Sequence, residues 1–138
     1  MIRSATAKDI PALLEMGRKF AERAKLEAHV GYDPHSMAQT FEAMIEGGHP
    51  IFVSDSGAIG ATQTQHPFNH EHVTAQELFW WSEGGGGLAL LDRLIEHCAE
   101  HCHSLQMITL EAVEPERVAK IYARKGFVPL ERSFVRVF

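Results

Sequence analysis

The N-terminal third of the chain repeats its apolar residues at helical spacing. One buried face is expected at Ile10, Leu13, Leu14, Gly17 and Phe20, which predicts a helix over about 8–24. The pair Thr6 and Asp9 is spaced as a capping box before this helix, and Pro11 fits its first turn. A short strand over residues 2–6 is expected to precede it.

A second helical repeat carries its apolar face on Met37, Thr40, Phe41, Met44 and Ile45. Ser36 and Gln39 are spaced to cap its start, and the pair Gly47-Gly48 is typical of a helix end. Helix spacing then gives way to strands at 51–53 and 58–65, joined by the turn at 55–57, which together predict a hairpin.

The next segment, residues 66–73, is polar and rich in histidine, and we expect it to be a loop before a fourth strand at about 74–81. A helical stripe follows at Leu88, Leu91, Ile95, Cys98 and Cys102. Residues 107–112 are expected to be a strand. Pro115 begins a short helix that ends near Gly126, and two last strands are expected at 127–130 and 133–138.

These elements occur in the order β-α-α-β-β-β-α-β-α-β-β. This order predicts a mixed α/β fold with a mostly antiparallel sheet flanked by helices. At 138 residues the chain has the length of one domain spanning 1–138, with a substantial core. No window approaches a membrane span, and two sparse cysteines favour a reducing cytoplasm over a disulfide framework.

The most distinctive stretch runs from Glu77 to Leu91, where an apolar strand enters four glycines and leaves them as a helix. A strand–glycine loop–helix unit directs backbone N–H groups and a helix N-terminus towards one point, which is a geometry that binds phosphate. A flexible surface loop is the alternative that this feature leaves open.

The net charge of −5 is unevenly distributed. Residues 115–138 hold six basic and two acidic residues and net +4, so the remaining chain nets −9. An acidic protein without a long basic stripe is a poor nucleic-acid binder. The C-terminal basic residues suit either a small phosphorylated ligand or solvated helix faces.

Three local patterns resemble those of the GCN5-related N-acetyltransferase (GNAT) family. Ser82-x-x-Gly85-x-Gly87, followed by Leu90-Leu91, is similar to the family's pyrophosphate loop, Gln/Arg-x-x-Gly-x-Gly/Ala. Val118-x-x-Ile121-Tyr122-x-x-x-Gly126-Phe127 resembles its C-terminal signature, and residues 52–60 resemble its second and third strands. The loop here begins with Ser82 and is about three residues shorter than the common form, and Pro115 replaces a frequent asparagine.

The resemblance implies the acyl-CoA N-acyltransferase fold and the transfer of acetyl from acetyl-coenzyme A directly to an amine in a ternary complex. Trp80, Trp81 and Ser82 would then line the pantetheine arm. The pyrophosphate would be held by Gly84, Gly85, Gly86, Gly87 and Leu88. The alternative is a degenerate, non-catalytic binding or sensor module with the same fold.

Two residues are candidates for the chemistry. Glu77 is the candidate base, because the apolar residues 78–81 around it would raise its pKa towards neutrality; a solvent-facing strand glutamate is the alternative. Tyr122 matches the family tyrosine often assigned as the acid for the leaving thiolate, and a core tyrosine is its alternative. Trp80 and Trp81 point to opposite sheet faces, so we expect one in the core and one near the acceptor.

The acceptor is expected to be a small-molecule or peptide amine that approaches from the second helix and the 66–73 loop, with 31–36 as a further specificity element. Histidines at 66, 70 and 72, and at 97, 101 and 103 beside the cysteines, pose a zinc alternative, but the spacing of neither cluster favours a metal site. The apolar ending 134–138 is compatible with a homodimer or with an inner strand.

Overall fold

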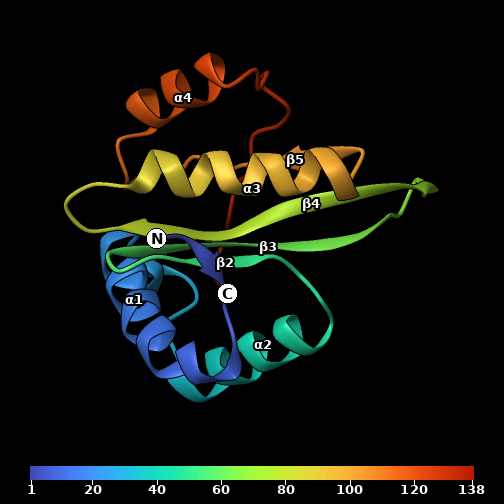
Figure 1. The fold of residues 1–138 in the computed structure, drawn as a ribbon. Helices are drawn as coiled ribbons and strands as arrows, with labels where there is room; N and C mark the ends of the chain where they lie inside the picture. Colours follow the sequence, from blue (N-terminus) through green and yellow to red (C-terminus); the bar gives the residue numbers. More distant parts are fainter.

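The computed structural model describes all 138 residues as a five-stranded sheet between two layers of helices (Figure 1). The elements are β1 (Arg3–Ser4), a 3-10 turn (Ala7–Asp9), α1 (Ile10–Arg23), a second 3-10 turn (Leu26–Ala28), α2 (Pro34–Glu46), β2 (Ile51–Val53), β3 (Gly57–His66), β4 (Asn69–Ser82), α3 (Gly87–His101), β5 (Ser104–Gln106) and α4 (Pro115–Arg124). The strands lie in sequence order, and only β4 and β5 run parallel. None of the four α-helices is long and apolar enough to cross a lipid bilayer.

The 3-10 turn that leads into α1 and the helix α2 both begin at polar capping residues. The backbone N–H of Thr6 donates to Asp9 Oδ2 at 2.7 Å, which confirms the predicted capping box. The cap of α2 is Asp33 and not Ser36: the Ser36 N–H donates to Asp33 Oδ2 at 3.1 Å. Pro34, with its fixed φ, fills the first helical position, so α2 starts two residues before the predicted cap.

Each face of the sheet has its own core. The face covered by α1 and α2 buries Ile10, Leu13, Phe41, Met44, Ile51, Val53, Ala58 and Phe79. The face covered by α3 and α4 buries Phe52, Ile59, Ala61, Ala75, Leu90, Leu91, Leu94, Cys98 and Tyr122. Of the predicted helical stripe after the glycines, Leu91 and Cys98 are buried, Ile95 and Cys102 are half-buried, and Leu88 is exposed. The buried face of α3 instead consists of Leu90, Leu91, Leu94 and Cys98.

The β3–β4 hairpin projects well beyond the helices (Figure 1). Its strands pair from Gly57–Ser82 out to His66–Asn69, which leaves only Pro67 and Phe68 in the turn. The expected loop at 66–73 is therefore wrong, because most of that segment is strand. With no helix covering the projecting part, polar side chains occupy both of its faces, so the period-2 pattern that marks a half-buried strand is missing.

The sheet is irregular where β4 approaches the glycines. Gly60 pairs with Phe79 and Ala61 pairs with Glu77, so Leu78 has no partner on β3 and forms a β-bulge. On its other side β4 pairs with β5 only over Thr74–Gln76. Beyond Gln106 the chain leaves β4, so the outer edge of residues 77–82 has no neighbouring strand.

Three predicted strands are corrected by this arrangement. The strand predicted at 107–112 is instead β5 at Ser104–Gln106. After Gln106 the chain turns away from β4, and we call the resulting gap between β4 and the chain after β5 the splay. The two strands predicted at 127–130 and 133–138 do not form, although the element order is as predicted up to α4. Alternating apolar residues favour a strand, but a strand also needs a paired edge, and these residues have none.

Candidate functional site

The glycine loop is held by hydroxyl groups that bind its backbone. Ser82 Oγ donates to the carbonyl oxygen of Gly85 at 2.7 Å, and Ser56 Oγ donates to the same oxygen at 3.2 Å. Gly84 and Gly86 have φ of +80° and +85°, which favours glycine at both positions. The N-cap residue of α3 is Gly86, which has no side chain, so the first backbone N–H groups of α3 are left without a side-chain acceptor.

A cleft of 530 Å³ opens beside this loop. Its walls come from α1, the end of β4, the loop and the start of α4. The lining residues are Phe20, Arg23, Trp80, Trp81, Ser82, Gly85, Gly86, Gly87, Leu88, Val113, Glu114, Arg117, Val118 and Ile121. Every residue expected to contact coenzyme A except Gly84 therefore lies along one cleft.

Both tryptophans line this cleft and both are half-buried. Trp80 also packs against the core between the sheet and α3, whereas Trp81 belongs to neither core. The Trp80 indole N–H donates to the carbonyl oxygen of Gly87 at 3.0 Å, which fixes the ring against the start of α3. The same ring lies beside Tyr122, with 6.2 Å between ring centroids. Trp80 thus contacts the start of α3 and lies beside the Tyr122 ring, and it also lines the cleft.

The side chains of Glu77 and Tyr122 hydrogen-bond to each other in the interior. The Tyr122 hydroxyl lies 2.6 Å from the carbonyl oxygen of Ile108 and 3.2 Å from Glu77 Oε1. Glu77 Oε1 also accepts from the Ile108 N–H at 3.2 Å. These three groups bridge the gap between β4 and the diverging chain after β5.

Burial dominates the protonation of this pair. Glu77 is only 8% exposed, and the loss of water raises the pKa of its carboxyl group to about 7. The hydrogen bonds from Ile108 and Tyr122 oppose that rise, but one hydroxyl hydrogen cannot serve two acceptors fully, and Ile108 has the shorter contact. Burial first, and the Glu77 charge second, raise the pKa of Tyr122, which stays neutral.

Neither Glu77 nor Tyr122 lines the cleft itself. Tyr122 follows the cleft-lining residue Ile121 on α4, and Glu77 lies three residues before Trp80 on β4. The two side chains hydrogen-bond to each other, and the Tyr122 ring lies beside the cleft-lining ring of Trp80.

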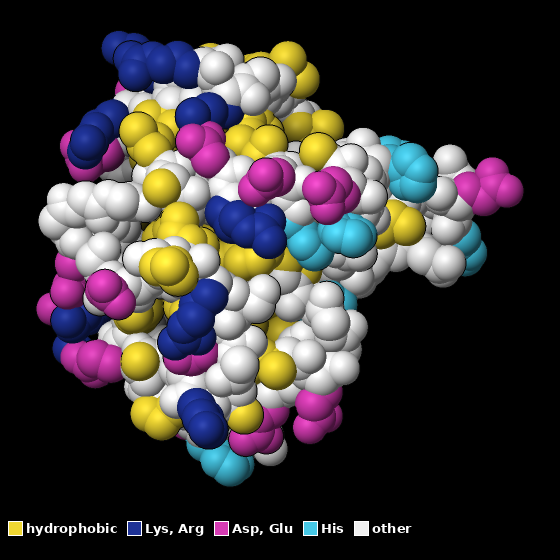
Figure 2. All heavy atoms as spheres, viewed as in Figure 1, with side chains coloured by type: hydrophobic (Ala, Val, Ile, Leu, Met, Phe, Trp, Pro, Cys, Tyr) yellow, Lys and Arg dark blue, Asp and Glu magenta, His cyan; other side chains and the backbone are white.

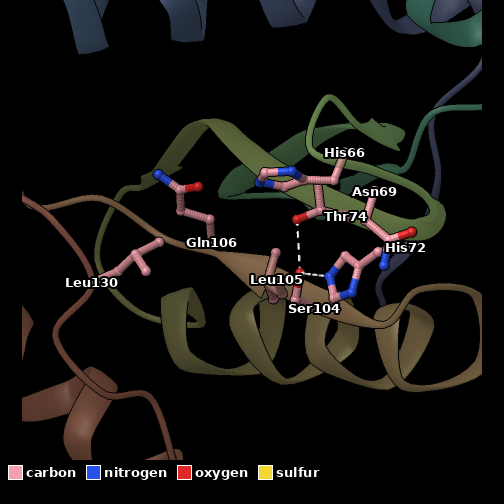
Figure 3. Close-up of a pocket in the computed structure, with 8 residues that line it drawn as sticks. All are labelled: His66, Asn69, His72, Thr74, Ser104, Leu105, Gln106 and Leu130. Carbon is pink, nitrogen blue, oxygen red and sulfur yellow. Dashed lines mark hydrogen bonds between the residues drawn. The ribbon is translucent and has the colours of Figure 1, made fainter.

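A second cavity, of 350 Å³, lies where β5 pairs with the first half of β4, away from the glycine loop (Figure 3). Its polar lining is uncharged apart from what the histidines contribute, and it comprises His66, Asn69, His72, Thr74, Ser104 and Gln106, with Leu105 and Leu130. His72 Nε2 and Thr74 Oγ1 each lie 2.8 Å from Ser104 Oγ, which makes a chain of hydrogen bonds across the two strands. Sequence patterns did not reveal this cavity, because it depends on the hairpin being strand.

The histidine and cysteine clusters have ordinary partners. His97 Nε2 lies 3.1 Å from Gln63 Oε1, and several histidines gather on the projecting hairpin (Figure 2). No group of three or more His, Cys, Asp or Glu side chains is arranged to hold a metal ion. Burial raises the pKa of the Cys98 thiol to about 12, which makes it a poor nucleophile.

No model of a known protein family matches the sequence. No curated protein matches it at a significant level. Among solved structures, a transcriptional regulator from Bacillus halodurans C-125 is similar with a TM-score of 0.77 and 20% identity, covering 100% of this chain and 99% of that one. A predicted acetyltransferase with acetyl-CoA from Clostridium acetobutylicum has a TM-score of 0.71 and 15% identity, covering 99% and 94%.

The ribosomal-protein-alanine N-acetyltransferase from Brucella melitensis has a TM-score of 0.68 and 23% identity, covering 91% of this chain and 83% of its own. TM-scores between 0.68 and 0.77 over nearly the whole chain establish a shared fold. The mixed α/β fold expected from the loop and helix patterns is thereby confirmed.

Proposed function

We propose that this chain, which has the fold of the GCN5-related N-acetyltransferases, transfers acetyl from acetyl-coenzyme A directly to an amine in a ternary complex. The observation that carries the proposal is the cleft, which runs from the glycine loop along the end of β4, with the Glu77–Tyr122 pair beside its lining residue Trp80. Acetyl-coenzyme A supplies an acetyl thioester when bound.

The residues present fit coenzyme A. A Cβ atom built on Gly84 or Gly85 would meet nothing within 4 Å, so a pyrophosphate can approach that backbone closely. The uncapped N–H groups at the start of α3 suit its charge. The unpaired edge of residues 77–82 can accept the amide groups of a pantetheine arm, as a further strand would.

Glu77 would act as the base. A carboxyl group with a pKa of about 7 is half ionised at neutral pH and can take a proton from an ammonium group, directly or through water. Tyr122, which burial keeps neutral, would donate its hydroxyl hydrogen to the leaving sulfur after parting from Ile108.

The acceptor would enter from the side of α2 and the hairpin. The second cavity offers hydroxyl, amide and imidazole groups there, and these suit an acceptor with hydrogen-bonding groups near its amine (Figure 3). The Brucella melitensis neighbour is named for N-acetylation of an alanine of a ribosomal protein, which supports a protein amine as one acceptor class. Small-molecule and peptide amines are both included in the proposal.

A homodimer is part of the proposal. The C-terminal segment 127–138 leaves large apolar side chains exposed, namely Val128, Leu130, Phe134, Val135, Val137 and Phe138, at 60% to 102%. The strand β5 at the end of the sheet has a free outer edge. Because each copy has one unpaired segment and one free edge, a two-fold pair of copies would satisfy both.

Two free cysteines support a cytoplasmic location.

The second candidate function is a non-catalytic coenzyme A sensor with the same fold. One observation favours it: Glu77 and Tyr122 hydrogen-bond to each other and do not line the cleft. A sensor would bind acetyl-coenzyme A without consuming it. Binding and turnover therefore need separate measurements.

Calorimetric titration with acetyl-coenzyme A tests the binding step. We expect micromolar binding that Gly85→Asp abolishes, because its carboxylate would face the pyrophosphate. The control is Gly85→Asn, which adds a side chain of similar size without the charge. A loss confined to Gly85→Asp would report repulsion of the pyrophosphate, and a loss with both variants would report steric exclusion. Thiol release with a panel of amines then tests turnover. Binding without turnover would favour the sensor, and no binding by the intact protein would contradict both functions.

A further inference from the structure

Helix α1 carries two basic residues one turn apart, Lys19 and Arg23, and each pairs with a carboxylate of another segment. Arg23 lines the cleft, and Lys19 lies next to the lining residue Phe20 in the sequence. Lys19 Nζ lies 2.7 Å from Glu83 Oε1, at the entrance to the glycine loop. Arg23 Nη2 lies 3.3 Å from Glu114 Oε2, immediately before α4. The same Glu114 oxygen accepts from Arg117 Nη1 at 3.3 Å. We call this set of contacts the ion-pair closure.

The ion-pair closure ties together parts of the fold that lie on opposite faces of the sheet. α1 belongs to one helical layer, and α4 to the other (Figure 1). Arg23, Glu114 and Arg117 all line the cleft, and Glu83 follows the lining residue Ser82. The Arg23–Glu114 contact therefore joins α1 to the residue before α4 across the cleft, and the Lys19–Glu83 contact joins α1 to the start of the glycine loop.

The pairing within the closure is far from optimal. One oxygen of Glu114 is shared by two guanidinium groups at 3.3 Å, whereas Arg prefers a two-pronged contact with two oxygens. The Glu114 backbone also has φ of 39° and ψ of 58°, a left-handed conformation that a non-glycine residue before proline rarely adopts. All five side chains are at least 36% exposed, so water can solvate the carboxylates once they are released.

We propose that the ion-pair closure is the unliganded form of a phosphate-binding site. Lys19, Arg23 and Arg117 leave Glu83 and Glu114 and bind the phosphate oxygens of a ligand in the cleft. Several negatively charged oxygens on neighbouring phosphates suit two guanidinium groups better than one shared carboxylate oxygen does. Glu83 and Glu114 then act as a barrier against weakly charged anions, which cannot displace them.

The identity of the ligand rests on the proposed function, whereas the anion chemistry does not. The site would serve either the pyrophosphate or the 3′-phosphate of coenzyme A. Pyrophosphate, coenzyme A and dephospho-coenzyme A are therefore the three probes. The two tryptophans of the chain both line the cleft, so their fluorescence reports binding.

The test compares two double variants that remove the same number of carboxylates. Glu83→Gln/Glu114→Gln opens the closure. Glu15→Gln/Asp92→Asn is the matched control, because it neutralises partners of Arg18 and Lys125 in ion pairs outside the cleft. We expect coenzyme A affinity to rise about tenfold in the first variant and by less than about twofold in the control.

Arg23→Gln/Arg117→Gln should lower pyrophosphate or coenzyme A affinity about tenfold. A loss limited to coenzyme A assigns the guanidinium groups to the 3′-phosphate, and a loss with all three probes assigns them to the pyrophosphate. Single Glu83→Gln and Glu114→Gln variants replace the double variant if it fails to fold. Equal affinities in the opened and control variants would overturn the proposal. Absence of acetyl transfer with these responses intact would contradict only the proposed function.

Discussion

Glu77 and Tyr122 lie 45 residues apart in the sequence and meet through one hydrogen bond in the interior. Their placement gives the carboxyl group two competing uses. It bridges the backbone of Ile108 across the splay, and its raised pKa suits proton transfer near neutral pH. The two uses predict different responses to one substitution.

Glu77→Gln preserves the side-chain shape and an acceptor for the Ile108 N–H but cannot take a proton. If Glu77 is the base, kcat should fall by about 100-fold or more. The wild-type rate should rise with pH through about 7, as the carboxyl group ionises. Steady-state rates from pH 5 to 9 measure both effects. Glu111→Gln, an exposed change after β5, is the control, and an unchanged rate for Glu77→Gln would exclude the base role.

The same pKa affects stability in a defined direction. Folding raises the Glu77 pKa from 4.5 to about 7, so its contribution is fully present below about pH 4.5 and is lost as pH rises through 7. The unfolding free energy of the wild type should fall by roughly 3 kcal/mol relative to Glu77→Gln between pH 4 and pH 8. Urea unfolding at several pH values measures this, and parallel pH profiles for the two proteins would contradict it.

The hairpin of β3 and β4 determines where the cleft lies. At its inner end Gly57 pairs with Ser82, and a Cβ atom built on Gly57 would approach the carbonyl oxygen of Trp81 to 2.3 Å. Close backbone approach therefore requires glycine there. Further along, the Leu78 bulge and the short β5 leave the edge of β4 open. The strands thus place the glycine loop and the open edge side by side.

Gly57→Ala should destabilise the protein by about 3 kcal/mol, because the added methyl group overlaps backbone that cannot move without breaking the strand pair. Gly85→Ala should change stability by no more than about 0.5 kcal/mol, because nothing lies within 4 Å of its added atom. Chemical denaturation of both variants measures the difference. Similar stability for the two would mean that β3 and β4 separate readily at this end.

Sequence patterns predicted the elements that one helix or turn determines by itself. The capping box at Thr6, both long N-terminal helices and the left-handed Gly126, with φ of +90°, follow from local chemistry. The projecting hairpin and the absent C-terminal strands depend on which neighbours cover or pair with a segment. The pair Arg23 and Glu114 was not predicted either, because exposed charged residues follow no periodic pattern and the two lie far apart in the sequence.

The molecule as a whole ends in a surface that a monomer leaves uncovered. The exposed fractions of Phe134 and Phe138 are 92% and 102%, so neither side chain contributes to the core of its own subunit. Lys, Arg, Asp and Glu are interspersed over the face seen in Figure 2, without a large region of one sign. Apolar contact in the C-terminal segment, and not charge, would therefore drive association.

Phe134→Lys/Phe138→Lys should convert a homodimer into a monomer without lowering thermal stability through the core, because both side chains are exposed in one subunit. Sedimentation velocity across a concentration series measures the oligomeric state. Glu42→Lys, a charge change at an exposed position of α2, is the control and should leave a dimer. A wild-type protein that stays monomeric at high concentration would contradict the proposal.

The open edge of β4 has a consequence for amide hydrogen exchange. Alternate N–H groups between residues 77 and 82 face the splay and have no strand to protect them. In the free protein they should exchange with solvent deuterium far faster than the amides that β4 directs to β3. A ligand that pairs with this edge would slow those amides selectively, so alternating protection along one strand would trace the path of a bound cofactor arm residue by residue.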